Sequence, residues 1–227
     1  MVSHRLIKAQ RDLASALYPV PVPIFETLNN HARLRKWLSA QDAPVFADRF
    51  SLHKHVSDKY VGQGAIDYLE FGVFEGQSFA KWMEYNAHPD SRFFGFDTFT
   101  GLPTDWGAHF KRGHFDVNGS APAMDDQRGK FIKGLFQDTL PPFLLEFGET
   151  GRPLVIHNDS DLYSSTAYTL AKLDHLIKPG TIIIFDEFAS PMHEFRAWND
   201  FCEAFMRRAQ LIGYSGPYAT QAAFRFE

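Results

Sequence analysis

The sequence predicts an α/β fold in which a mostly parallel sheet carries helices on both faces. From Ala65 onward, short apolar runs alternate with helical patterns, as in a chain of β and α units. The first apolar run leads into a glycine-rich strand-to-helix turn, where glycine permits positive φ angles. Several runs also end in acidic residues, at the carboxyl ends of strands where such folds bind ligands.

Length and composition restrict the class of protein. The chain has 227 residues and is 44% hydrophobic, which is enough for one full core. Its net charge of −4 is spread along the sequence, so we expect neither nucleic acid nor anionic lipid as a partner. Cys202 is the single cysteine, which excludes an intramolecular disulfide and favours a reducing compartment. With no signal-peptide or membrane-spanning pattern, we expect a cytoplasmic protein.

Residues 1–64 are expected to form an N-terminal helical arm and cap before a catalytic domain at 65–227. Helical spacing over 3–17 is followed by three prolines, at 19, 21 and 23, which interrupt it, and further helices are predicted at 32–38 and 46–61. Glycines 62 and 64 end the last of these. An arm of this kind can reach a second subunit, which would make a homo-oligomer.

The remaining elements follow in order along the chain. We predict strands at 66–71, 92–96, 130–133, 154–157 and 181–185, and helices at 76–86, 139–147, 164–176 and 194–209. A closing hairpin at 210–214 and 221–226 would add an antiparallel strand. The long loop over 98–124 is expected to help recognise the substrate, with candidate pocket residues Trp106, His109, His114 and Phe115.

The motif YLEFGVFEGQSF, which begins at Tyr68, predicts a binding site for a nucleotide-like ligand. Glu70 stands near the end of the strand, and Gly72 and Gly76 lie in the turn before a helix whose N-terminus can bind a carboxylate. The spacing is neither a dinucleotide fingerprint nor a P-loop. Asp97 ends the next strand, 27 residues after Glu70, close to the separation of about 20 expected for a ribose-binding acid. Alternatively, Asp97 only caps its own turn.

A second acidic group follows two later strands. Asp159, Asp186 and Glu187 are expected to converge, and their oxygen ligands suit Mg²⁺ or Ca²⁺. Without a cation, the three carboxylates would repel one another. A bound ion would orient an acceptor and lower the pKa of its attacking hydroxyl. His157 is a candidate general base, although a strand-end histidine is more often structural, and Asp161 suits a helix cap equally well.

Two other functions are compatible with parts of the sequence. The run Asp159-Ser160-Asp161 is also a DxD pattern, which would hold a nucleotide sugar in a metal-dependent glycosyltransferase. The glycine turn and the pair Glu70 and Asp97 argue against that class. A non-catalytic binding protein of the same fold is the other alternative, and the intact motifs argue against it.

Together, five motifs identify a family resemblance over residues 65–209. YLEFGVFEGQS, GFDTFTGLP, KGLFQDTLP, HNDSDLYSST and FDEF resemble the macrocin O-methyltransferase family of class I S-adenosylmethionine (SAM) enzymes. The resemblance implies a seven-stranded Rossmann-like sheet, SAM as methyl donor, a divalent metal, usually Mg²⁺, and a sugar or aromatic hydroxyl as acceptor.

The resemblance also implies a role for individual residues. The methionine end of SAM would contact Glu70, Gly72 and Ser78, the ribose would contact Asp97, and the block around Gly134, Phe136, Gln137 and Asp138 would pass near the adenine. Gly76 and Thr98 are further candidates for cofactor binding. The metal ligands would be Asp159, Asp186 and Glu187, with Asp159 also a possible base. Two positions depart from the family pattern: Glu187 replaces a frequent aspartate, and Asn158 places an extra polar group near the acceptor.

Overall fold

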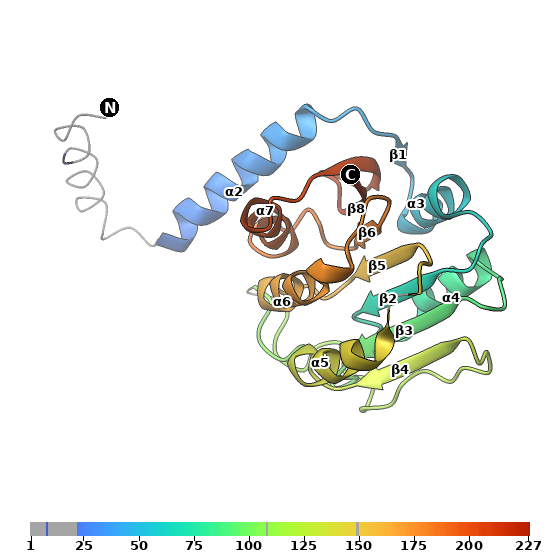
Figure 1. The fold of residues 1–227 in the computed structure, drawn as a ribbon. Coiled ribbons are helices and arrows are strands. Elements are labelled where there is room, and N and C mark those ends of the chain that lie inside the picture. Colours follow the sequence, from blue (N-terminus) through green and yellow to red (C-terminus); the bar gives the residue numbers. More distant parts are fainter. Residues whose placement is uncertain (1–7, 9–21, 108, 149) are drawn as a thin grey trace.

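The computed structural model describes residues 8, 22–107, 109–148 and 150–227, and it contains an eight-stranded sheet between two layers of helices (Figure 1). The α/β fold predicted from the sequence is therefore confirmed. The helix predicted at 3–17 lies, apart from Lys8, outside the described residues.

The strands lie in the order β1-β7-β8-β6-β5-β2-β3-β4. Their bounds are β1 Val45–Phe46, β2 Asp67–Phe71, β3 Arg92–Asp97, β4 Gly129–Lys133, β5 Leu154–Asn158, β6 Ile182–Phe185, β7 Ala209–Ser215 and β8 Gln221–Phe226. As predicted, β8 runs antiparallel to its neighbours β6 and β7. The other described strand pairs are parallel.

The sheet has one strand more than the seven that the family resemblance implies, because β1 pairs with β7. The predicted helix at 46–61 is therefore wrong at its start. Phe46 belongs to β1, and Asp48 caps a helix that begins at Arg49, with Asp48 Oδ1 accepting the Ser51 N–H at 2.9 Å. Part of the expected N-terminal arm is thus a strand of the same sheet.

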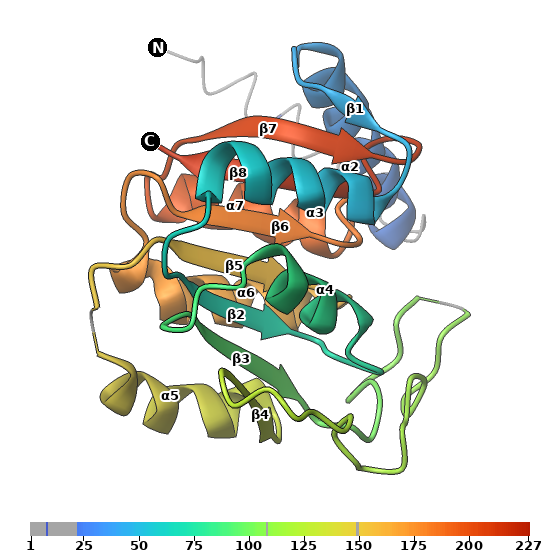
Figure 2. The same cartoon turned by 90° about the vertical axis from the view of Figure 1, so that its right-hand side faces the viewer.

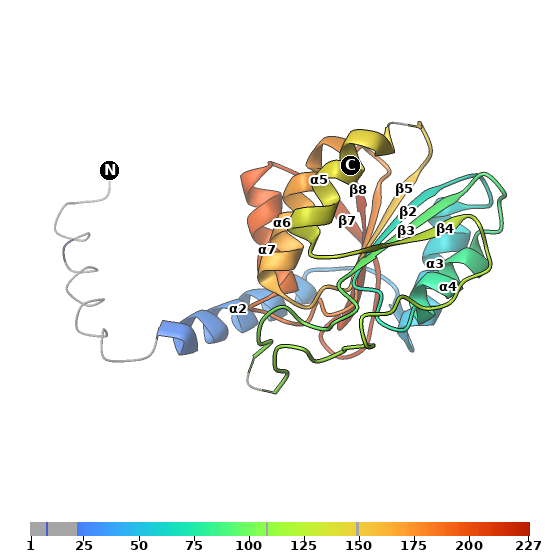
Figure 3. The ribbon, with the colours of Figure 1, turned by 90° about the horizontal axis from the view of Figure 1, so that it is seen from below.

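The helices form a layer on each face of the sheet. They are α2 Val22–Ser39, α3 Arg49–Val56 continued by η1 Ser57–Val61, α4 Gln77–Tyr85, α5 Phe136–Phe147, α6 Tyr163–Leu173 continued by η2 Asp174–Leu176, and α7 Glu194–Ala204. Figure 3 shows α5, α6 and α7 on one face and α3 and α4 on the other. The last helix ends at Ala204 rather than at 209, because Ala209 already pairs with Phe226 in the sheet. No helix among the described residues is long and apolar enough to cross a membrane.

Strand β2 shows how the alternation of side chains divides the core. Leu69 and Phe71 belong to the cluster under α5, α6 and α7, whereas Tyr68 belongs to the cluster under α3 and α4. Glu70 shares the face of Tyr68 and pairs in register with His157 of β5. Two ionisable side chains are therefore buried together beneath α3 and α4.

The strand order reverses at β2, which lies between β3 and β5. Open α/β sheets bind ligands at such a switch point, outside the carboxyl ends of the strands. Figure 2 shows the loop between β3 and β4 projecting beyond those ends.

Candidate active site

A cavity of about 540 Å³ lies at the carboxyl ends of the central strands, within the range of about 300–1,000 Å³ usual for small-molecule sites. Its wall brings together eight of the residues predicted from the sequence. They are Gly72, Asp97, Thr98, Phe136 and Gln137 of the donor set and Asp159, Asp186 and Glu187 of the metal set. Gly76 and Gly134 are in neighbouring turns and are not lining residues.

Gly72 follows β2, at a point where its backbone comes close to the backbone of Asp159. Its φ is +90°, and a Cβ built on it would lie 1.8 Å from the backbone oxygen of Asp159. The Gly72 N–H donates to the Phe96 carbonyl at 2.9 Å, which joins the turn to β3. Both the close approach and the positive φ require glycine at this position.

Asp97 supports the same turn from the neighbouring strand. Its Oδ2 accepts the N–H groups of Val73 at 2.7 Å and Phe74 at 2.8 Å, and its Oδ1 accepts the Phe99 N–H at 2.7 Å. Asp97 therefore caps local backbone and also lines the cavity. Because a carboxylate offers about four lone-pair positions, one remains for a ligand hydroxyl.

Glu70, Ser78 and His157 lie beneath the cavity rather than in its wall. Ser78 Oγ donates to Glu70 Oε1 at 2.9 Å, and the Tyr68 hydroxyl donates to Glu70 Oε2. His157 Nδ1 is 3.0 Å from the Tyr68 hydroxyl oxygen. The histidine is completely buried, so it is not placed to take a proton from an acceptor, and its predicted role as general base does not fit the structure.

The cavity concentrates acidic groups. Burial, followed by the charge of Asp186, raises the pKa of Asp159 well above its usual value. Burial also raises the pKa of Asp161 and of Glu187 to about 7 each, with a neighbouring carboxylate as the next cause. Arg49 is the one basic side chain among the described lining residues, and it pairs with Asp186 at 3.0 Å. This excess of oxygen donors and negative charge suits a hard divalent cation.

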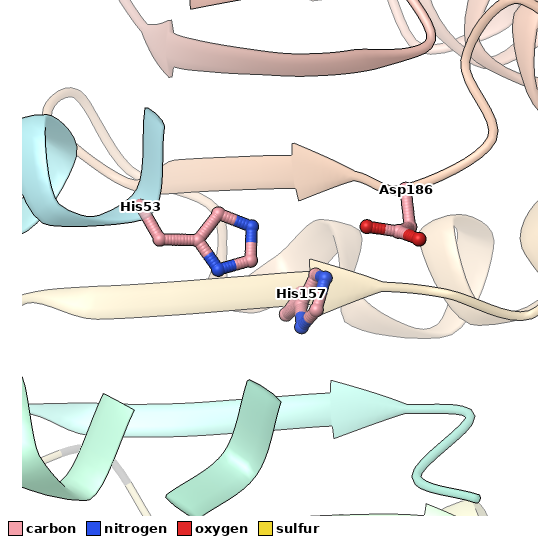
Figure 4. Close-up of side chains that lie close together, drawn as sticks. All are labelled: His53, His157 and Asp186. Carbon is pink, nitrogen blue, oxygen red and sulfur yellow. The ribbon is translucent and has the colours of Figure 1, made fainter. Parts of the chain in front are cut away.

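The structure does not bring the three predicted metal ligands together as closely as expected. Among the described residues, the one group of three possible ligands with atoms within 4.8 Å of one another is His53, His157 and Asp186 (Figure 4). Asp186 Oδ2 is instead held by Arg49 of α3. Asp159 and Glu187 share the cavity wall with Asp186 without joining this group.

Three residues of the site were missed by sequence reasoning. Arg49 and His53 come from α3, and nothing in their spacing points to the strand ends. Glu194, the first residue of α7, is completely buried and accepts hydrogen bonds from Asn158 Nδ2 and from the Glu187 N–H, both at 3.0 Å. Burial raises the pKa of Glu194 well above its usual value.

This contact also corrects the expectation for Asn158. The amide is 1% exposed and donates to Glu194 and to Thr166 Oγ1, the latter at 3.1 Å. It joins β5 to α6 and α7 and does not face an acceptor.

The loop over 98–124 contributes aromatic side chains to the wall. Trp106 and Phe115 line the cavity. His114 instead packs against Phe110 and Phe115, with ring centroids 4.8 and 4.4 Å apart, and His109 is exposed to solvent. Two of the four predicted pocket residues therefore face the cavity.

Comparison with known proteins gives consistent matches. The model of the macrocin-O-methyltransferase (TylF) family matches residues 51–212. A curated relative from Streptomyces olivaceus, 8-demethyl-8-(2,3-dimethoxy-alpha-L-rhamnosyl)-tetracenomycin-C 4'-O-methyltransferase, is 28% identical over 188 residues, which are 71% of this chain and 70% of that protein.

Solved structures share the fold. The calicheamicin methyltransferase CalS11, also described as a TDP-rhamnose 3'-O-methyltransferase, has a TM-score of 0.60 and 22% identity, covering 99% of this chain and 94% of CalS11. A form of cmcI with Mg and SAM has a TM-score of 0.54 and 16% identity, covering 79% of this chain and 72% of cmcI.

Proposed function

This chain belongs to the macrocin-O-methyltransferase family and is a SAM-dependent O-methyltransferase, and we propose that its acceptor is a sugar hydroxyl of a glycosylated small molecule. Because this family consists of methyltransferases, the alternative hypothesis that the chain is a glycosyltransferase is rejected. The observation that carries the proposal is that the predicted donor residues and the acidic residues line one cavity.

In this proposal SAM binds along the turn between β2 and α4. Its methionine end lies at Gly72, its ribose at Asp97 and Thr98, and its adenine near Phe136 and Gln137. All of these residues line the same cavity, which supports the arrangement. We further propose that residues 65–227 form the catalytic unit, to which α3 adds Arg49.

The acceptor binds on the acidic side of the same cavity. Carboxylates accept hydrogen bonds from several hydroxyls at once, which suits a sugar ring. Trp106 and Phe115 provide apolar faces for the rest of the molecule. The relative from Streptomyces olivaceus and CalS11, by their names, both methylate a rhamnose-containing compound.

We assign Asp159, Asp186 and Glu187 to a divalent cation, Mg²⁺ by preference. All three offer oxygen ligands at one cavity wall, and a cation offsets the burial and the mutual repulsion that raise the pKa of Asp159 and Glu187. When bound, the ion supplies positive charge that lowers the pKa of the acceptor hydroxyl. Asp186 can take part through Oδ1, which has no hydrogen-bond partner, while Arg49 holds Oδ2.

The transfer itself is a substitution at the methyl carbon. The acceptor oxygen attacks opposite the sulfonium sulfur, so that the new C–O bond forms as the C–S bond breaks and S-adenosylhomocysteine leaves. The hydroxyl proton passes to the Asp159 carboxylate. Most of the rate enhancement then comes from holding the oxygen in line with the methyl group, and a base adds about 10²–10⁴-fold.

A methyl-transfer assay tests the proposed acceptor. Purified protein receives radiolabelled SAM with a rhamnosylated aromatic compound or with its sugar-free aglycone, with and without Mg²⁺. We expect label on the glycoside alone, and a rate that falls when the metal is chelated. Methylation of the aglycone would exclude the sugar acceptor, and a rate unaffected by chelation would exclude the metal.

The variant Asp159→Asn tests the assigned base. We expect turnover to fall by about 100-fold or more, while calorimetry shows nearly unchanged affinity for S-adenosylhomocysteine. Asp90→Asn, which changes an exposed carboxylate, is the matched control. Full activity of Asp159→Asn would reject its role.

A further inference from the structure

His53, His157 and Asp186 form a buried cluster between α3 and the sheet (Figure 4), and Asp186 also lines the cavity. Both histidines are completely buried, and Asp186 is 5% exposed. Both ring nitrogens of His53, Nε2 of His157 and Oδ1 of Asp186 have no hydrogen-bond partner. A buried polar atom that is left without a hydrogen-bond partner destabilises the folded protein. Four such atoms in one cluster therefore point to a bound partner.

The hydrogen bonds around His157 determine which of its two ring nitrogens has a lone pair that can bind a ligand. The Tyr68 hydroxyl gives its one proton to Glu70, so its oxygen accepts the proton on His157 Nδ1, 3.0 Å away. Nε2 is then left with a lone pair. Histidines that bind metals are held in this way, with the far nitrogen bonded to an oxygen group that sets the tautomer and orients the ring.

His53 supplies a second nitrogen from the facing helix. Its ring meets that of His157 edge to face, with centroids 4.9 Å apart. Burial is the main cause that holds the pKa of His53 well below its usual value, and the charge of Arg49 acts in the same direction. The ring is therefore neutral, and one of its nitrogens carries a lone pair in either tautomer.

We propose that His53, His157 and Asp186 bind a divalent transition-metal ion such as Zn²⁺, at a site that adjoins the proposed Mg²⁺ site and shares Asp186 with it. Two imidazoles and one carboxylate are ligands that zinc favours and magnesium does not. Three atoms within 4.8 Å of one another can all lie at most about 2.8 Å from a central ion. Zinc–nitrogen bonds measure about 2.0–2.1 Å, so each side chain has to move by less than about 1 Å.

The site would tie three elements together. His53 belongs to α3 and His157 to β5, and Asp186 follows β6. Because Asp186 is also a proposed Mg²⁺ ligand, an ion held by the two histidines engages a group that methyl transfer uses. Transition-metal ions and Mg²⁺ would therefore have different effects on methyl transfer by this protein.

Cobalt titration of the full-length, chelator-stripped protein tests the proposal, since Co²⁺ bound to nitrogen ligands absorbs visible light. We expect one Co²⁺ per chain with visible bands that Zn²⁺ abolishes and a 100-fold excess of Mg²⁺ does not. His53→Ala should lose these bands. Glu187→Gln should keep them, as should His31→Ala, which removes an exposed histidine of α2.

The hydroxyl that orients His157 provides a second variant. Tyr68→Phe should weaken Co²⁺ binding by about 10–100-fold, as loss of such oxygen partners does in other metal sites. Circular dichroism shows whether each variant folds, and His53→Gln replaces His53→Ala if the alanine variant does not.

Two results would overturn the site. One is wild-type protein without visible cobalt bands, which would identify the cluster as a pocket for buried water. The other is a His53 variant that folds and binds Co²⁺ as the wild type does. Since SAM and the acceptor are absent from the titration, either result leaves the proposed methyl transfer untouched.

Discussion

At Gly72 the donor site depends on the absence of a side chain. In Gly72→Ala the new Cβ would meet the Asp159 carbonyl oxygen at 1.8 Å, so the ends of β2 and β5 have to separate. We expect the free energy of unfolding to fall by about 2–4 kcal/mol, and affinity for S-adenosylhomocysteine to fall with it. Urea unfolding and calorimetry measure the two effects.

Gly64→Ala is the matched control for this substitution. A Cβ at Gly64 meets nothing within 4 Å, and its φ is not in the left-handed region. Near-normal stability is expected for it. A Gly72→Ala protein as stable as this control would show that the ends of β2 and β5 can separate without a loss of stability.

Asp97 is a second residue on which donor binding is expected to depend. Asp97→Ala removes the acceptor of three backbone N–H groups and the proposed ribose ligand. We expect at least tenfold weaker binding of S-adenosylhomocysteine in calorimetry, since the loss of hydrogen bonds to a charged group costs about 1.5–3 kcal/mol. Asp90→Ala should bind normally, and unchanged affinity of Asp97→Ala would refute the ribose assignment.

At the scale of elements, the amino-terminal and carboxyl-terminal ends of the strands have separate roles. Asp67, at the amino-terminal end of β2, is 3% exposed. It accepts hydrogen bonds from Arg92 Nε at 2.7 Å, from Arg92 Nη2 at 2.9 Å and from Thr150 Oγ1 at 2.6 Å. These contacts join β2 to β3 and to the segment before β5, on the side opposite the cavity.

Asp67→Ala should therefore affect stability and leave ligand binding unchanged. Removing one partner of a buried pair costs about 3–5 kcal/mol, and the partial exposure of Arg92 reduces this to about 2–3 kcal/mol. Urea unfolding measures the loss, and calorimetry should show unchanged affinity for S-adenosylhomocysteine. Glu84→Ala, which breaks the exposed pair with Lys81, should cost under about 1 kcal/mol. A large loss of affinity in Asp67→Ala would show that the amino-terminal ends of the strands influence ligand binding at the carboxyl-terminal ends.

Strands β2 to β6 could be predicted from sequence because each contains a short apolar run that is bounded by polar residues, glycine or proline. β2 to β6 begin and end within about a residue of the predicted bounds. β1 was not predicted, because a strand of two residues has no periodicity that a sequence pattern could detect. The start of α3 could have been predicted, since Asp48 followed by Ser51 is typical of a helix N-cap. Glycines and acids at strand ends could be assigned to the cavity, because parallel strands bring their carboxyl ends together.

Residues from outside the strand ends could not be assigned in this way. Arg49 meets Asp186 across 137 positions of the chain, through the packing of α3 on the sheet. His53 reaches His157 by the same packing, and sequence spacing gives no information about it. The burial of Glu70 beneath the turn, rather than in the cavity wall, was likewise fixed by contacts with Tyr68 and Ser78.

At the scale of the whole molecule, the acidic cavity makes stability depend on pH. Burial raises the pKa of Asp161 from 3.8 to about 7. Between about pH 4 and pH 7 the folded protein therefore keeps a proton that the unfolded chain releases. The free energy of unfolding should fall as pH rises through this range and level off above it, by up to a few kcal/mol.

Urea unfolding in the presence of a chelator, at pH 5, 6, 7 and 8, tests this prediction. Asp161→Asn, which cannot titrate at this position, should show a smaller decrease than the wild type. Equal decreases in both proteins would mean that Asp161 does not hold the proton.

Finally, the order of the strands places short or charged segments at both edges of the sheet. β1 covers the end of β7 with two residues, and β4 closes the opposite edge with Lys130 and Lys133 exposed. An open strand edge is a template on which another chain can extend a sheet, and brief strands and lysines oppose such pairing. The folded protein should therefore resist aggregation through its sheet even when it is highly concentrated, and aggregates should arise from molecules that have first lost β1 or β4.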